Sequence, residues 1–369
     1  MKSIPYDRFF NLVTLANTLL ARYNVQPFHP PIPSLLEQLK SHTKIVCLLM
    51  DGMGKAIVDR HLKPTAFLQD HRSLTITSTF PSTTAAATNA FLSGKYPGEI
   101  GWLGWAQYFP ELGAMVELFT GNEYFSQKPL ISPIELRKKI DYHSIFELIQ
   151  RANPSLHVDA VWPAIRPGGA STLDAWEAQI DQHLAYDEVL LYGYWLDPDK
   201  SIHTMGVNHS HITEIVDSID QTISRLHQKH PDTLFLVFAD HGLIDVTFTP
   251  INEYEDFYEC LTRSFALEPR AATFYVKPEK HQDFVRLFHH YYGQWFALYT
   301  QEDVQRDQLY GEGAYHPRFR EFIGDFVAVS HGKVSFSHGV PIGEKPLNFV
   351  AHHAGMHPDE MMIQLFVVG

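Results

Sequence analysis

Acidic side chains follow three separate apolar runs of the sequence, each near the point where the run ends. Asp51 directly follows the run at 45–50, and Asp199 and Asp240 come shortly after two further runs. In open α/β sheets ligands bind outside the carboxyl ends of the strands, so these carboxylates are expected to converge on one place. Clustered carboxylates repel one another and need a cation. The alternative for any one of them is a helix cap or a turn residue.

Three histidines lie beside these carboxylates or in a glycine turn. His203 is four residues from Asp199, so on a helical turn the two share one face. His241 directly follows Asp240, and His353 stands in a His-His-Ala-Gly turn. Mixed Asp and His ligation suits zinc, and iron and manganese less well. A lone histidine is usually structural, but three in this register predict a metal site.

A stretch rich in threonine and alanine provides a candidate nucleophile. Residues 79–87 read TFPSTTAAA, with Pro81 at the expected entry to a helix and Gly94 at its expected end. Thr84 would lie in the first turn of this helix, where free backbone N–H groups and the helix dipole favour a phosphoryl group. A threonine hydroxyl is a weak nucleophile and needs a metal ion or a base. The alternative is that the Ser/Thr cluster only caps the helix.

Alternating secondary-structure elements are expected to position these residues. Short apolar runs predict strands at 44–50, 74–79, 156–162, 189–195 and 233–238. Helical spacing of apolar residues predicts helices at 7–24, 82–92, 144–152 and 212–227. Strands that alternate with helices favour an α/β fold, with a doubly wound, mostly parallel sheet and helices on both faces.

Several segments lie outside this alternation. Residues 1–43 are expected to form an N-terminal extension before a catalytic domain over 44–369. The segments 98–133 and 247–320 fit the alternation poorly and are possible cap insertions over the active face. Residues 358–362 are expected to begin a terminal helix.

The overall composition excludes several classes of protein. With 29 Lys and Arg against 42 Asp and Glu, the formal net charge is -13, so the chain repels duplex nucleic acid at long range. Two distant cysteines, Cys47 and Cys260, cannot build a disulfide framework or a cysteine zinc site. The longest clean apolar run is far shorter than the ~20 residues of a membrane span, and the N-terminus lacks signal-peptide features. We therefore expect a cytoplasmic protein that does not bind a membrane.

Taken together, these motifs resemble the type I phosphodiesterase / nucleotide pyrophosphatase family of the alkaline phosphatase superfamily, from residue 44 to residue 365. The sequences that carry the resemblance are IVCLLMDGMG at 45–54, FPSTTAAATNAFLSGKYP at 80–97, Asp199-x-x-x-His203, Asp240-His241-Gly242 and His353-Ala354-Gly355-Met356. The combination in this order is specific, although no single motif would be.

The resemblance implies an alkaline phosphatase-like fold and a hydrolase of phosphate esters that uses two divalent ions, most readily zinc, with manganese or iron as alternatives. The implied ligands are Asp199, His203 and His353 for one ion, and Asp51, Asp240, His241 and the Thr84 oxygen for the other. Counting back from Gly94 places the nucleophile at Thr84 rather than Thr83. Attack by Thr84 on phosphorus implies a phosphothreonine intermediate.

Two departures from the family pattern concern substrate binding and the late turn. Ala354 stands where glycine is usual. The stretch 101–105 lacks the asparagine that grips a phosphate oxygen in the nucleotide pyrophosphatase branch, and Lys55 is a possible substitute.

The expected substrate is a small phosphate ester. No arginine follows Thr84, which favours diesters or pyrophosphates over dianionic monoesters. Trp102 and Trp105 could form a wall that stacks a base, or could pack beneath a cap. The alternatives are a phosphomonoesterase or phosphomutase of the same superfamily, or a non-catalytic protein that binds a metal or ligand. The sequence does not predict an oligomeric state.

Overall fold

The centre of the main sheet consists of three strands predicted from the apolar runs. The computed structural model describes residues 6–339, 342–343 and 349–369, and in it β1 (Lys44–Met50) lies between β6 (Val189–Trp195) and β7 (Thr233–Phe238), parallel to both. Their side chains are almost all buried. Apolar runs without alternation are typical of parallel strands that are covered on both faces. The three predicted strands have the same bounds in the structure.

The main sheet has six strands in the order β2-β16-β7-β1-β6-β5 among the described residues. β5 (His157–Val161) is parallel to β6 and forms one edge, and β2 (Arg72–Thr77) forms the other. β16 (Met362–Val368) is antiparallel to both of its neighbours. Five strands therefore share one direction, which confirms the predicted mostly parallel sheet.

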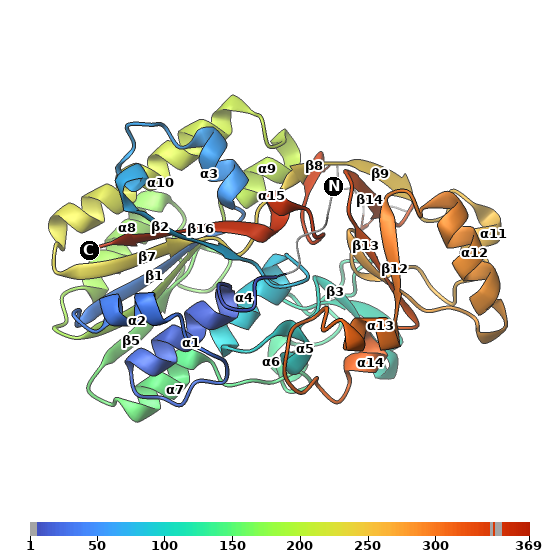
Figure 1. Ribbon diagram of the computed structural model, residues 1–369, viewed down its shortest axis with the longest axis horizontal. Helices are drawn as coiled ribbons and strands as arrows, with labels where there is room; N and C mark the ends of the chain where they lie inside the picture. The colour runs from blue at the N-terminus through green and yellow to red at the C-terminus, as the bar shows by residue number, and fades with distance from the viewer. Residues whose placement is uncertain (1–5, 340–341, 344–348) are drawn as a thin grey trace.

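Helices cover both faces of this sheet (Figure 1). One group contains α1 (Leu12–Arg22), α2 (Pro33–Leu39), α4 (Thr84–Ser93) and α7 (Ile145–Ala152), and the other contains α3 (Lys55–His61), α8 (Leu173–His183) and α10 (Ser210–Lys229). α10 buries one apolar stripe, including Ile212, Val216 and Ile219, against the main core. The doubly wound α/β architecture is confirmed. None of the helices in the described ranges combines the length and apolar character needed to cross a membrane.

The predicted N-terminal extension packs directly on the main core. Residues 1–5 of this segment lie outside the described part of the chain. Leu12 and Leu19 of α1 and Leu35 of α2 are fully buried in the same hydrophobic cluster as β1. α1 also contacts α4, so this segment supports the helix that begins at the candidate nucleophile.

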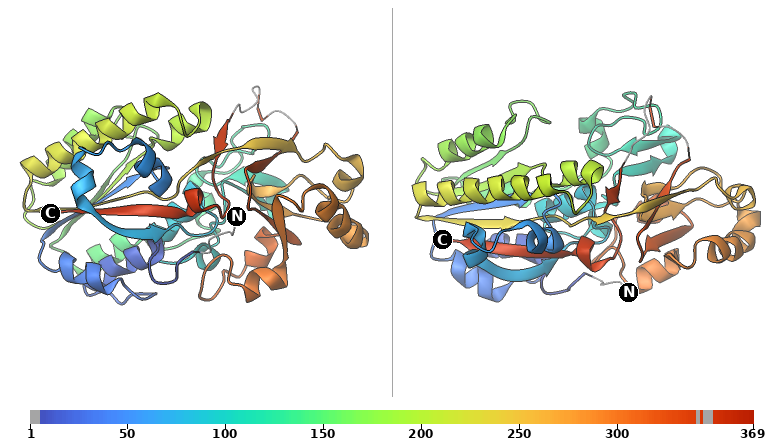
Figure 2. Two further views of the ribbon diagram at one scale, coloured as in Figure 1. Left: turned by 45° about the horizontal axis from the view of Figure 1, so that its top comes forward. Right: turned by 90° about the horizontal axis from the view of Figure 1, so that it is seen from above.

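A second, antiparallel sheet lies beside the first along the long axis of the molecule (Figure 2). Its strands, in spatial order, are β12 (Phe296–Thr300), β13 (Phe326–Ser330), β11 (Ala271–Phe274), β10 (Ala266–Glu268), β3 (Ala106–Phe109) and β4 (Ala114–Glu117). β3 and β4 come from the segment 98–133, and β10 to β12 come from 247–320. The two segments that fitted the alternation poorly therefore pair with each other, through β3 and β10.

The helix predicted to start at 358 is present, but the prediction that it is the terminal element is wrong. α15 (Pro358–Met361) has only four residues, and the chain then continues as β16 between β2 and β7. The sequence of β16, MIQLFVV, is rich in β-branched and aromatic residues, which suit a half-buried pleated surface. Because residues 362–368 pair with β2 on one side and with β7 on the other, they form a strand rather than a helix.

Candidate active site

The carboxylates that follow β1, β6 and β7 meet at the carboxyl ends of these strands. Asp51 directly follows β1, and Asp240 comes two residues after β7. Asp199 is the first residue of α9 (Asp199–Met205), and His203 lies one turn further along the same helix. Two groups have ligand atoms within 4.8 Å of one another, namely Asp51, Asp240 and His241, and Asp199, His241 and His353. His241 belongs to both groups, so the groups are neighbours.

The first group surrounds the Thr84 hydroxyl. His241 Nε2 lies 3.4 Å from Asp51 Oδ1 and 3.5 Å from Asp240 Oδ2. Thr84 Oγ1 lies 3.2 Å from His241 Nε2 and 3.4 Å from Asp51 Oδ1. Ligands of one tetrahedral zinc ion, each about 2.0–2.2 Å from it, are separated by roughly 3.4 Å. The spacing of these atoms therefore fits a shared cation.

The second group contains the other two histidines. Asp199 Oδ2 lies 3.4 Å from His203 Nε2, and Asp199 Oδ1 lies 3.8 Å from His353 Nε2. The rings of His353 and His241 are stacked with centroids 3.9 Å apart, which brings the two groups side by side.

The three imidazoles share one orientation. Each Nδ1 faces a backbone carbonyl: His203 faces Ala351 at 2.9 Å, His241 faces Gly242 at 3.1 Å, and His353 faces Ser82 at 3.2 Å. A carbonyl can only accept, so Nδ1 carries the hydrogen and the lone pair is on Nε2. Each Nε2 points at the carboxylates, the arrangement by which metal-binding histidines are usually held.

Two carboxylate oxygens of the site lack a partner. Asp199 Oδ1 and Asp240 Oδ2 are buried and accept no hydrogen bond from any part of the chain that the structure describes. Burial, and then the charges of Asp240 and Asp199, raise the pKa of Asp51 well above its usual range. Burial likewise raises the pKa of Asp240. Buried carboxylates without partners are unfavourable, so the residues fit a bound cation.

The two adjacent threonines point to different places. Thr84 is the first residue of α4 and Thr83 is its N-cap. The Thr83 hydroxyl donates to Glu268 Oε1 at 2.6 Å, whereas the Thr84 hydroxyl faces Asp51 and His241. Of the two threonines, only Thr84 therefore lies against the candidate metal-ligand groups. Its position in the first helical turn, where an anion is favoured, is as predicted.

Comparison with known proteins agrees with this geometry. A sequence model of the type I phosphodiesterase / nucleotide pyrophosphatase family matches residues 45–354. The chain belongs to this family. No curated protein matches the chain in sequence. As a family member the chain is a phosphodiesterase-type hydrolase of phosphate ester bonds, which confirms the predicted enzyme class.

Solved structures of ectonucleotide pyrophosphatase / phosphodiesterase 5 have the same fold as this family member. The human protein is 16% identical over 88% of each chain, with a TM-score of 0.67. The mouse protein is 15% identical over 87% of each chain, with a TM-score of 0.66. An inactive threonine-to-alanine variant of the mouse protein, in complex with AMP, has a TM-score of 0.65 at 15% identity and the same coverage. These matches confirm the predicted alkaline phosphatase-like fold.

Two further residues of the site were not predicted from the sequence. The hydroxyl of Tyr194, in β6, donates to Asp51 Oδ2 from a buried position. Its signal in the sequence was one of two tyrosines, Tyr192 and Tyr194, inside an otherwise apolar central strand. Glu268, at the end of β10, is 2% exposed and accepts from both Thr83 Oγ1 and the Trp105 backbone N–H. Burial raises the pKa of Glu268 to about 7.

The late turn that contains His353 is held by a buried ion pair. Arg270, between β10 and β11, binds Glu360 with Nε to Oε1 at 2.7 Å, and both side chains are fully buried. Glu360 Oε1 also accepts from the backbone N–H of Gly355 at 2.8 Å. Ala354, where the family usually has glycine, adopts a φ of 89°, and its N–H donates to the Ser82 carbonyl. The alanine thus occupies the left-handed region that glycine favours.

The three candidate substrate-binding residues lie in different surroundings. Lys55, at the start of α3, pairs with Asp59 one turn along the helix. Asp59 also pairs with Arg72. Trp102 is buried in the core of the second sheet, and its Nε1 donates to the Ile140 carbonyl. Trp105 is 37% exposed, and its backbone contacts Glu268. Only Trp105 is both exposed and joined, through Glu268 and Thr83, to the start of α4.

Proposed function

We propose that this protein hydrolyses phosphodiesters or nucleotide pyrophosphates in two displacements, with Thr84 as the nucleophile. The observation that carries the proposal is the Thr84 hydroxyl, which lies 3.2 Å from His241 Nε2 and 3.4 Å from Asp51 Oδ1 at the N-terminus of α4. The mouse relative whose threonine-to-alanine variant is inactive supports the same role for a threonine.

We assign two divalent ions to the two neighbouring groups. The proposed ligands are Asp199, His203 and His353 for one ion, and Asp51, Asp240, His241 and Thr84 Oγ1 for the other. When bound, divalent ions lower the pKa of a hydroxyl or water and stabilise charge that develops on oxygen. The mixed Asp and His donors favour zinc, with manganese or iron as alternatives.

In the first displacement Thr84 Oγ1 releases its proton to water and forms a bond to phosphorus, and the ester or anhydride oxygen leaves with its electron pair. The phosphothreonine that results keeps the remaining ester group of a diester. The N-terminus of α4 directs backbone N–H groups at the phosphoryl oxygens. In the second displacement a water oxygen loses a proton and attacks the same phosphorus, and Thr84 Oγ1 leaves with its electron pair and takes up a proton, which restores the hydroxyl. Tyr194 keeps the Asp51 carboxylate in place by its hydrogen bond throughout.

The preference for diesters rests on the residues after the nucleophile. Ala85, Ala86 and Ala87 are fully buried and provide no guanidinium to grip a dianionic monoester. The inactive variant of the mouse relative was solved in complex with AMP, a nucleotide. A nucleotide base is proposed to pack against Trp105, the exposed aromatic next to the site.

A substrate comparison tests this function. Zinc-loaded protein is incubated with bis-p-nitrophenyl phosphate, p-nitrophenyl phosphate and a dinucleoside pyrophosphate, and the products are quantified. We expect faster turnover of the diester and the pyrophosphate than of the monoester. Rapid quenching followed by peptide mass spectrometry should detect the phosphoryl adduct on Thr84. Preferred hydrolysis of the monoester, or an adduct on another residue, would overturn the assignment.

A further inference from the structure

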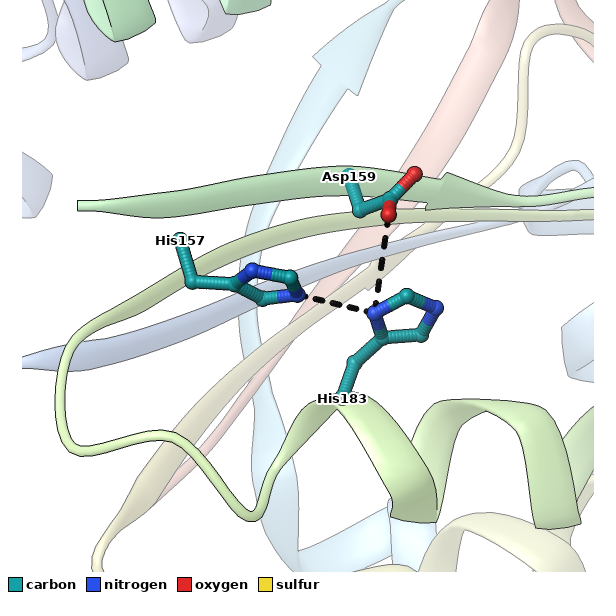
Figure 3. A group of neighbouring side chains, drawn as sticks. All are labelled: His157, Asp159 and His183. Atoms are coloured by element: carbon teal, nitrogen blue, oxygen red, sulfur yellow. Dashed lines mark hydrogen bonds and ion pairs between the residues drawn. The ribbon is translucent and has the colours of Figure 1, made fainter. Parts of the chain in front are cut away.

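A second cluster of potential ligands lies at β5, the edge strand of the main sheet. β1 and β6 separate β5 from β7. His157 and Asp159 are two residues apart on β5, so both side chains lie on the same face of the strand. His183 is the last residue of α8, which packs against β5 and β6. Figure 3 shows the three side chains facing one another. No residue of the candidate active site contributes to this cluster.

The ligand atoms of the cluster are close together. His157 Nε2 lies 2.9 Å from His183 Nδ1, and His183 Nδ1 lies 3.8 Å from Asp159 Oδ2. The donor atoms of all three residues fall within 4.8 Å of one another. Tyr186 stacks on the His157 ring at a centroid distance of 3.8 Å and an angle of 12°, which restricts the rotation of that ring.

We propose that His157, Asp159 and His183 form a third cation site, which binds a first-row divalent transition ion such as zinc, cobalt or nickel. Two imidazoles and one carboxylate suit these ions, whereas magnesium and calcium require oxygen ligands. Three protein ligands leave at least one coordination position for water or an external ligand.

The short distance between the two histidines is consistent with this role. A hydrogen bond between two imidazoles requires one ring to accept, so at least one nitrogen presents a lone pair to the cluster. Binding of an ion requires His157 Nε2 and His183 Nδ1 to separate to roughly 3.4 Å, which is the spacing of two ligands on one tetrahedral zinc ion. The His183 side chain is 25% exposed at the end of a helix, and the Asp159 side chain is 52% exposed, so both have room to adjust.

Occupation of the site would join the end of α8 to the edge of the main sheet. Strand edges are places where sheets pair with other chains, and a bound ion together with an ordered helix end would cover part of this edge. The site is partly exposed, so it is expected to bind its ion more weakly than the buried groups beside Thr84.

Metal titration of matched variants tests the proposal. Metal-free wild type, His183→Ala and Asp159→Asn are titrated with cobalt(II), followed by visible absorption and by metal content after gel filtration. The control is His211→Ala, because His211 is also a helix histidine beside a carboxylate, with Nδ1 2.7 Å from Glu214, but it belongs to no group of three potential ligands among the described residues. A parallel titration with magnesium serves as the negative probe.

Wild type and His211→Ala are expected to bind one more equivalent of cobalt than His183→Ala and Asp159→Asn, with unchanged hydrolysis of bis-p-nitrophenyl phosphate. The test compares the cobalt bound by wild type with the cobalt bound by each variant. It therefore still tests this site if the groups beside Thr84 bind no metal. Equal stoichiometry in wild type and His183→Ala would overturn the proposal. Loss of the extra equivalent in His211→Ala alone would place the site elsewhere.

Discussion

Thr83 and Glu268 are joined by a buried hydrogen bond of 2.6 Å between the threonine hydroxyl and one carboxylate oxygen. This contact links the N-cap of α4, on the main sheet, to the last residue of β10, in the second sheet. It engages the Thr83 hydroxyl away from the metal-ligand groups and leaves Thr84 as the threonine that faces them.

The roles of the two threonines are separable by substitution. Thr84→Ala is expected to lower kcat for a diester substrate by at least about a thousandfold, because loss of a nucleophile removes the covalent route. Thr83→Ala is expected to keep most of the turnover. Both variants should retain the bound metal, measured by elemental analysis. The opposite pattern of activities would move the nucleophile to Thr83.

Chelation is expected to abolish activity. Dialysis against EDTA should stop hydrolysis of bis-p-nitrophenyl phosphate, and added zinc should restore it, because the buried carboxylates of Asp199 and Asp240 each present an oxygen without a partner among the described residues. Asp240→Asn should reduce zinc affinity, measured by competition with a chromophoric chelator. Full activity in protein shown to be free of metal would exclude the two-ion assignment.

Glu268 is expected to make the stability of metal-free protein depend on pH. Burial raises its pKa in the folded state to about 7, above the value of an unfolded glutamate, so the folded state holds the proton more tightly. The free energy of unfolding should therefore fall as pH rises from about 4.5 to about 7, by roughly 3 kcal/mol for this group, and level off above that range.

The control for this titration is Glu268→Gln, which keeps an acceptor for Thr83 but cannot lose a proton. The unfolding free energies of wild type and variant are measured by urea denaturation across this pH range. As pH rises, the variant should become more stable relative to wild type. A constant difference would show that Glu268 does not hold its proton as inferred.

Ala354→Gly is expected to stabilise the fold. Ala354 has a φ of 89°, where a Cβ atom is unfavourable, and glycine removes this strain at a gain of about 1 kcal/mol. Ala351→Gly is the matched control, because Ala351 is buried in β15 (Ala351–His352) and should lose stability instead. Thermal unfolding of both variants checks the prediction, and a lower Tm for Ala354→Gly would contradict it.

Arg270→Met is expected to destabilise the protein by about 3–5 kcal/mol, because it leaves the Glu360 carboxylate buried without its cation. It should also weaken zinc binding, since Glu360 holds the Gly355 N–H in the turn that contains His353. Unfolding and zinc titration are measured on the same preparation. Unchanged zinc affinity in a folded variant would show that the ion pair between Arg270 and Glu360 does not support the metal site.

The main sheet and most site residues could be predicted because their signals are local. β1, β6 and β7 are uninterrupted apolar runs, and Asp51 and Asp240 follow two of them within two residues. Asp199 and His203 are one helical turn apart, so their shared face follows from helix geometry. These features depend on neighbours in the sequence, and single-sequence patterns capture them.

The second sheet and Glu268 could not be predicted because their signals are distant. β10 has only three residues, and it pairs with β3, which comes from the other irregular segment. Glu268 reads in the sequence as an ordinary surface glutamate, and only tertiary packing buries it beside Thr83. β16 was missed for the same reason, since partners on both sides make it a strand.

The interior position of β16 has a consequence for synthesis of the protein. Among the described residues β2 joins the sheet only through β16, and β16 follows all the other strands in the sequence. A chain emerging from the ribosome therefore cannot attach β2 until residues 362–368 have been made. Until then β2 and β7 both have unpaired backbone edges, which are the parts of an incomplete sheet most open to pairing with other chains.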